Sequence, residues 1–132
     1  MVTTSGKIFK HHIIGGANRW DIIAALERFR RQVRRPLIVV WDRASIHTAR
    51  IVMEYFSENK DISAEFLPPY APELNPEESC HGNVKQRLGN FVPVSIQEMR
   101  RMVDNGFARL RRRPDLLLHF FQRSGLRITQ FR

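Results

Sequence analysis

The chain has 132 residues, which is enough for one domain with one core and too short for two. Lysine and arginine outnumber aspartate and glutamate by 22 to 13. The resulting net charge of +9 favours a polyanionic partner, nucleic acid ahead of an acidic membrane, although charge alone is equally compatible with simple solubility. A single cysteine excludes a disulfide framework and a cysteine-based zinc cluster, and the lack of a long apolar run or a signal-peptide core indicates a soluble intracellular protein.

The first half of the chain predicts strands that alternate with helices. Apolar residues recurring every three or four positions predict two amphipathic helices, at about 18–34 and 48–59. Short runs rich in β-formers predict strands at Lys7–Ile14, at Leu37–Trp41 and within 64–70. The run Leu37–Trp41 is apolar without alternation, which predicts a strand buried on both faces, as in a parallel sheet beneath helices.

The second half predicts helices only, at about 75–88, 95–113 and 114–125. Asn75 is a good N-cap residue, and Pro76 suits the first helical position because its missing N–H costs nothing there. Ser95, with Glu98 three residues later, forms a capping-box pattern. Pro114 restarts the last helix. The order of elements indicates an α/β fold.

Asp42 comes directly after the apolar strand, where the loops of α/β sheets collect functional groups. A carboxylate at the carboxyl end of a strand can ligate a metal without uncovering the core. The alternative is an aspartate that forms a turn or caps the next helix. The role of His47 also has two interpretations. It can orient a phosphate or a metal-bound water, or it can cap the following helix.

Two adjacent glutamates, Glu77 and Glu78, occupy the second and third positions of the helix that Asn75 caps, where the helix dipole stabilises an anion. A helical wheel places Glu78 on a polar side of this helix, while Glu77 points elsewhere. The side that is expected to be buried carries Cys80, Val84 and Leu88. Glu78 therefore either closes a capping box with Asn75 or reaches a second carboxylate.

Asp42 and Glu78, if they converge from a strand and a helix, supply the oxygen ligands that Mg²⁺ prefers and leave positions open for phosphate. Two such ions clamp the attacking and leaving oxygens of an in-line phosphoryl transfer. The positive net charge indicates that the phosphate belongs to DNA or RNA.

The stretch "VVWDRASIH", followed by "LPPYAPELNPEES", resembles the catalytic domain of mariner-like DDE transposases, in particular the bacterial insertion-sequence branch (the IS six-thirty type). The resemblance implies that residues 1–132 form a single domain, the C-terminal portion of that catalytic domain. The expected architecture is a partial ribonuclease-H-like fold, a mixed sheet with flanking helices that lacks its first strands and is followed by C-terminal helices. Such a truncated sheet leaves edges unpaired, so self-association or marginal stability is expected.

The resemblance also assigns roles. Asp42 and Glu78, separated by 35 residues, match the second and third acids of the triad that binds Mg²⁺ or Mn²⁺, and His47 and Asn75 support them. Arg43 replaces the family's usual asparagine, and His81 stands where tryptophan is common. The residues expected to contact DNA are Arg43, Lys85, Arg87, Arg109, Arg111, Arg112 and Arg113, although the last four also suit a solvated helix end.

The first acid of the triad is missing from this pattern, because Asp21 and Glu27 both lie in a predicted helix. We therefore expect metal-dependent cleavage and strand transfer of transposon-end DNA to be absent or very weak in this chain alone, with weak metal binding. An upstream transposase half is an expected partner, as is a second copy of the chain, in the bacterial cytoplasm near the nucleoid. The alternative is a non-catalytic nucleic-acid-binding or interaction module, or a remnant without a present role.

Overall fold

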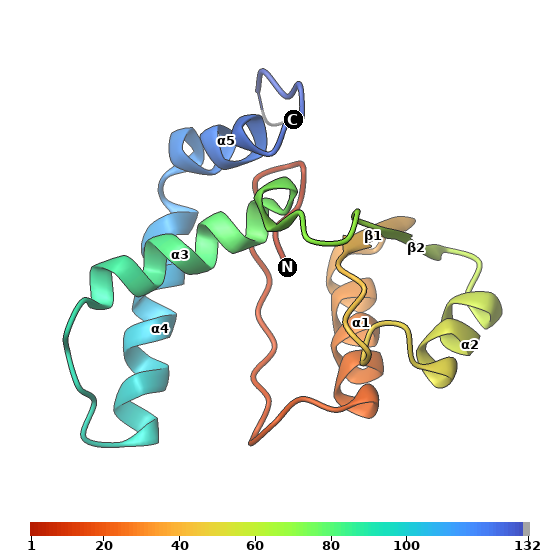
Figure 1. Cartoon of the computed structure of the whole chain (residues 1–132), viewed down its shortest axis with the longest axis horizontal. Helices are drawn as coiled ribbons and strands as arrows, with labels where there is room; N and C mark the ends of the chain where they lie inside the picture. The colour runs from red at the N-terminus through yellow and green to blue at the C-terminus, as the bar shows by residue number, and fades with distance from the viewer. Residues whose placement is uncertain (131–132) are drawn as a thin grey trace. The chain divides into compact units, whose positions relative to one another are not determined.

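The computed structural model describes residues 1–130 (Figure 1). The chain forms two compact units, one made of residues 9–71 and the other of residues 1–8 together with the segment from Pro72 onward. Each unit has its own apolar core. The expectation of one domain over residues 1–132 stays a prediction.

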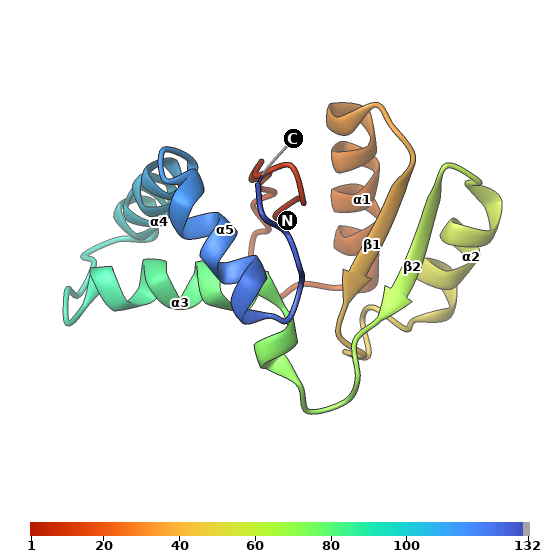
Figure 2. The ribbon, with the colours of Figure 1, turned by 90° about the horizontal axis from the view of Figure 1, so that it is seen from above.

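The first of these units, residues 9–71, is an α/β arrangement of four elements (Figure 2). They are α1 (Arg19–Val33), β1 (Leu37–Trp41), α2 (Arg50–Glu58) and β2 (Ile62–Phe66). The two strands pair in parallel with Leu37 opposite Ile62 and Trp41 opposite Phe66, and α2 is the crossover between them. The predicted α/β class is confirmed, with a two-stranded parallel sheet.

Local capping explains where α1 begins and ends. The side chain of Asn18 accepts hydrogen bonds from the backbone N–H groups of Trp20 and Asp21, and Asp21 Oδ2 accepts the N–H of Asn18 in return. This capping box satisfies N–H groups that have no partner within the helix. Arg34 closes the helix in the left-handed region, with φ of 54°.

Both helices cover the same face of the sheet, and the core lies between them and the strands. Its most buried members are Leu26, Val52, Phe56 and Ile62. The predicted burial of β1 on both faces is wrong, because Ile38 is 70% exposed and Val40 is 55% exposed. Within residues 9–71 no helix covers that second face, so every other residue of this apolar strand is exposed.

The other unit is helical. It contains a short 3-10 turn (Pro72–Leu74), α3 (Pro76–Leu88), α4 (Ile96–Arg111) and α5 (Pro114–Arg123), and α3 contacts both later helices (Figure 1). Cys80 and Val84 on α3 pack with Phe107 and Leu110 on α4, and Leu88 packs against this cluster, so the predicted buried side of α3 is confirmed. Gly106 on α4 permits close approach, since a Cβ there would lie 2.7 Å from Val84 Cγ1.

The predicted strand Lys7–Ile14 is wrong. Ile8 forms a single antiparallel bridge with Val2, across a turn in which Gly6 has φ of 74°, and residues 9–14 form neither helix nor strand. β-Propensity reflects how side chains fit against neighbouring strands rather than a strong backbone preference. No neighbouring strand pairs with this segment in the described chain, and Ile14 is 86% exposed.

None of the helices in residues 1–130 has the length and apolar content needed to span a bilayer.

Candidate active site

Asp42 lies at the carboxyl edge of the parallel sheet, directly after Trp41, the last residue of β1. Functional groups of open α/β sheets gather at this edge, because the loops that leave the strands meet there. The side chain is 61% exposed, so the carboxylate faces solvent rather than the core.

The loop after β1 folds back onto the Asp42 carboxylate. Oδ1 accepts the backbone N–H of Ala44 at 3.0 Å and also contacts Nδ1 of His47 at 2.7 Å. The hydrogen bond from Ala44 and the contact with His47 hold the pKa of Asp42 below its usual value, against the opposing effect of partial burial. Asp42 is therefore ionised at neutral pH, as a metal ligand must be.

His47 is held by an aromatic stack. Its ring lies parallel to the indole of Trp41, with centroids 4.4 Å apart and planes 5° apart. Trp41 in turn meets Phe56 edge to face at 5.7 Å. The geometry explains why His47 is only 20% exposed although it sits in a loop. The structure brings Asp42 and His47 together, and His47 does not cap α2, for which no side-chain cap bond forms.

Arg43, the residue expected to contact DNA beside Asp42, lies over the ring of Phe66 at the end of β2, with its guanidinium carbon 5.0 Å from the centroid. This is a cation–π arrangement, and it directs the guanidinium along the carboxyl edge of the sheet. Phe66 was a residue of the predicted strand and carried no functional prediction.

The start of α3 matches the predicted cap. Asn75 Oδ1 accepts the backbone N–H of Glu77 at 3.0 Å, and Pro76 is the first helical residue. The carboxylate of Glu78 makes no hydrogen bond or ion pair with any residue in 1–130, so it does not close a capping box with Asn75. Glu78 is exposed, as are His81 and Lys85 on the same side of the helix.

Glu77 has a different environment from Glu78. Its side chain is 37% exposed, and Oε1 lies 2.8 Å from the amino group of Met1 and 3.6 Å from Nε2 of His81. Burial raises the pKa of this carboxyl, but the hydrogen bond with His81 and the positive amino group outweigh that effect and bring the pKa down to about 2. The ring of His81 also meets Phe107 edge to face. Glu77 is thus engaged within the protein, while Glu78 is free in the described chain.

Several predicted DNA-contacting arginines hold the helical unit together. Arg109 donates to Asn83 Oδ1 at 2.9 Å, Arg111 donates twice to the carbonyl oxygen of Ile8, and Arg113 forms a two-point pair with Asp115. Within residues 1–130 the guanidinium of Arg112 has no such partner.

A cluster of positive charge nevertheless forms in this unit. Partial burial, and then the nearby cations of Arg87 and Arg113, lower the pKa of Arg109. Lys85 and Arg87 are exposed in the last turns of α3. Guanidinium groups that repel one another in this way attract a polyanion.

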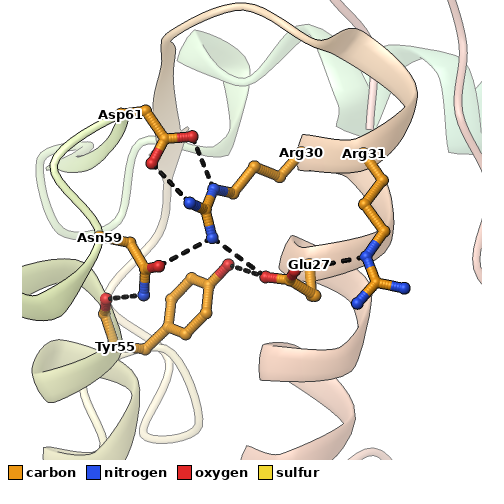
Figure 3. Close-up of polar contacts among 6 residues, drawn as sticks. All are labelled: Glu27, Arg30, Arg31, Tyr55, Asn59 and Asp61. Atoms are coloured by element: carbon orange, nitrogen blue, oxygen red, sulfur yellow. Dashed lines mark hydrogen bonds and ion pairs between the residues drawn. The ribbon is translucent and has the colours of Figure 1, made fainter.

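The two other early acids are engaged in structural contacts. Asp21 completes the cap of α1. Glu27 accepts hydrogen bonds from Tyr55 at 2.7 Å and from Arg30 at 3.2 Å, and the bond from Tyr55 contributes most to lowering its pKa (Figure 3). Both carboxylates thus serve contacts within residues 9–71.

No group of three or more His, Cys, Asp or Glu side chains in residues 1–130 gathers closely enough to hold a metal ion. Asp42 and Glu78 belong to different units, and their meeting in one metal site stays a prediction. The chemistry of both groups fits a hard divalent cation, since each is an exposed carboxylate with at least one oxygen that no residue in 1–130 binds.

The stack of Trp41 on His47 was not predicted from the sequence, where Trp41 was only the last residue of a strand expected to be buried. It does pack against Phe56, but its other partner is His47. The available signal was its position: it is the last strand residue, next to Asp42 and six residues before a histidine.

These features define an α/β protein with an ionised acid at the carboxyl edge of a parallel sheet. The family described as DDE superfamily endonuclease matches residues 1–99, and the chain belongs to this family. Endonucleases of this superfamily act on DNA and generally use divalent metal ions. No curated protein and no solved structure matches the chain.

Proposed function

We propose that the chain is the C-terminal part of the catalytic domain of a mariner-like DDE transposase of the bacterial insertion-sequence branch, with a ribonuclease-H-like fold. It acts in DNA transposition by metal-dependent phosphodiester cleavage and strand transfer. The observation that carries this proposal is the ionised Asp42 at the carboxyl edge of the sheet in a chain of the DDE superfamily. The motif that ends in Glu78 points to the specific branch.

In this proposal Asp42 and Glu78 are the protein ligands of Mg²⁺ or Mn²⁺. When bound, the cation stabilises the charge that develops on the phosphate oxygens and activates the attacking hydroxyl. Asn75 fixes the first turn of α3 and thereby the base of the Glu78 side chain.

The first acid comes from a segment encoded upstream, because Asp21 and Glu27 are engaged in structural contacts. Without it, two carboxylates bind a cation weakly and do not fix two ions, so the chain alone has little or no activity. The complete enzyme works on transposon ends, in the bacterial cytoplasm at the nucleoid.

The test is nicking of transposon-end DNA in the presence of Mn²⁺, with the upstream segment supplied in trans. Asp42→Asn and Glu78→Gln should each abolish nicking while the chain keeps its helical circular dichroism spectrum. Glu73→Gln, which alters an exposed acid three residues before Pro76, is the matched control and should nick at the wild-type rate. Undiminished nicking by either of the first two variants would remove that carboxylate from the mechanism.

A second candidate is a nucleic-acid-binding module without catalysis, and the cluster of Arg87, Arg109 and Arg113 favours it. Such a module binds DNA without metal, and its affinity falls steeply with salt. Binding that persists in EDTA, in a chain that never nicks DNA with its upstream segment, would establish this candidate. Metal-dependent nicking would exclude it.

A further inference from the structure

Both contacts that hold the Asp42 carboxylate end on one oxygen. The N–H of Ala44 and Nδ1 of His47 both reach Oδ1, at 3.0 and 2.7 Å. Oδ2 accepts no hydrogen bond from any residue in 1–130. Because the side chain is 61% exposed, Oδ2 is the oxygen that is open to a ligand from solvent.

The same contacts fix the tautomer of His47. Nδ1 faces two oxygens of Asp42, Oδ1 of the carboxylate and, at 3.3 Å, the backbone carbonyl oxygen. Neither oxygen carries a proton to donate when the carboxylate is ionised. The proton of the neutral imidazole therefore lies on Nδ1, and His47 donates to Asp42 without having to become charged.

Trp41 fixes the plane of the imidazole, because the two rings are stacked at 4.4 Å with planes 5° apart. A half-turn about the Cβ–Cγ bond would keep this stack, so the contacts of Nδ1 with Asp42 select which side of the ring faces the carboxylate. Phe56 meets Trp41 edge to face at 5.7 Å, which helps to keep the indole in place. The chain of contacts thus runs from the core of the sheet, through Trp41 and His47, to a single oxygen of Asp42.

We propose that His47, backed by Trp41, is a positioning residue that holds Asp42 so that Oδ2 alone is presented to a divalent cation. The assignment rests on the proposed function, because it takes Asp42 as a metal ligand. Asp42 would then offer a cation one oxygen, in a direction set by His47 and Ala44. Without His47, Oδ1 keeps only the bond from Ala44, and the carboxylate can turn to offer both oxygens or neither.

The experiment is a titration of Mn²⁺ into the whole chain, up to millimolar concentrations. Electron paramagnetic resonance measures the concentration of free Mn²⁺ at each step. His47→Ala should weaken binding about 10- to 100-fold, the usual effect of removing a partner that orients a metal ligand. His47→Asn should retain much of the affinity, because its amide N–H can donate from near the position of Nδ1. Trp41→Phe keeps a flat ring behind the histidine and should bind more tightly than Trp41→Leu. His119→Ala, at an exposed position of α5, is the control and should match wild type.

A second readout needs no metal. In chains labelled with ¹⁵N-histidine, the ring nitrogen shifts of His47 should report a proton on Nδ1, and Asp42→Ala should remove this preference. A purely structural role for His47 would lower the melting temperature of His47→Ala and leave its Mn²⁺ affinity unchanged.

The outcomes separate this inference from the proposed function. If wild type binds Mn²⁺ and Asp42→Asn abolishes binding, but His47→Ala binds as wild type does, the positioning role is overturned and the proposed function stands. A proton on Nε2 of His47 also overturns the positioning role. If Asp42→Asn binds Mn²⁺ as well as wild type, the proposed function fails and the positioning role fails with it.

Discussion

Arg30 on α1 binds Asp61, the residue before β2, through two parallel hydrogen bonds: Nε lies 2.6 Å from Oδ2 and Nη2 lies 2.7 Å from Oδ1 (Figure 3). Nη1 of the same guanidinium donates to Asn59 and to Glu27. One side chain thus joins α1 to the turn that connects α2 and β2. The planar fork of arginine suits this arrangement, and the single ammonium of lysine does not.

Arg30→Lys should therefore lower the melting temperature of the chain, because lysine cannot reach Asp61, Asn59 and Glu27 together. Arg31→Lys is the matched control. Arg31 is the next residue, its side chain is 78% exposed and it has one long contact with Glu27, so its replacement should leave the melting temperature unchanged. Circular dichroism during heating measures both melting temperatures. Equal values for the two variants would show that the Arg30 contacts contribute nothing to stability.

Tyr55 extends this set of contacts. Its hydroxyl donates to Glu27 at 2.7 Å, and burial together with this bond raises the pKa of Tyr55. Tyr55→Phe should lower the free energy of unfolding by about 1–2 kcal/mol, since a hydrogen bond to a charged group is lost. Urea denaturation measures the change. A free energy of unfolding equal to that of wild type would mean that water replaces the hydroxyl as the partner of Glu27 without cost.

Signals for helix ends act over a few residues, and the sequence was sufficient for them. Asn75 and Pro76 start α3 as predicted. Ser95 accepts the N–H of Glu98, although the Glu98 carboxylate bonds the N–H of Val94 instead of completing the predicted capping box. The predicted helix at 95–113 ends at Arg111, two residues early, because Pro114 begins the next helix.

The predictions that were wrong concerned segments whose structure depends on residues far away in the sequence. Lys7–Ile14 had the composition of a strand but no strand to pair with among residues 1–130, and within residues 9–71 no second layer of helices covers Ile38 and Val40. At the site, the spacing between Asp42 and His47 was recognised, but the stack on Trp41 depends on how the loop leaves β1. Whether Asp42 meets Glu78 depends on two separate units, which no local pattern specifies.

The exposed face of β1 predicts self-association. Ile38 and Val40 form an apolar pair on a strand whose second edge is unpaired within the described chain. The double substitution Ile38→Thr and Val40→Thr keeps β-propensity and removes apolar surface, so it should shift the sedimentation velocity profile towards monomer. A wild-type chain that sediments as a monomer at all concentrations would contradict this prediction.

The effects of substitutions at Gly106 and Val84 on the free energy of unfolding should depend on one another. Alanine usually stabilises a helix interior by about 1 kcal/mol relative to glycine. At Gly106, however, the new Cβ would lie 2.7 Å from Cγ1 and 3.2 Å from Cγ2 of the buried Val84, and such overpacking costs about 1–3 kcal/mol. Gly106→Ala should therefore destabilise the wild type, while the same change in a Val84→Ala background should be neutral or stabilising. Stabilisation in both backgrounds, measured by urea denaturation, would rule out the close approach.

Glu77 should make stability depend on pH in the acid range. Its pKa in the folded protein is about 2, below the ordinary value of 4.5. A depressed pKa contributes stability that is present above pH 4.5 and is lost as the pH falls towards 2. Because the side chain is 37% exposed, solvent screening limits the contribution to about 1 kcal/mol. Unfolding free energies of Glu77→Gln should fall less between pH 4.5 and 2 than those of wild type, and parallel curves would contradict the prediction.

Substitutions of the neighbouring residues Arg111 and Arg112 should have different effects, the first on stability and the second on DNA binding. Arg111 donates to the carbonyl oxygen of Ile8 at 3.2 and 2.9 Å, whereas Arg112 has no partner within residues 1–130. Arg111→Gln should lower the free energy of unfolding by about 1 kcal/mol, because a charge-assisted contact is lost. Arg112→Gln should leave stability unchanged and weaken DNA binding, with the slope of log affinity against log salt reduced by about 0.9 for one phosphate contact. Fluorescence anisotropy over a salt series measures this slope. An unchanged slope for Arg112→Gln would mean that this end of α4 lies in solvent and away from the DNA.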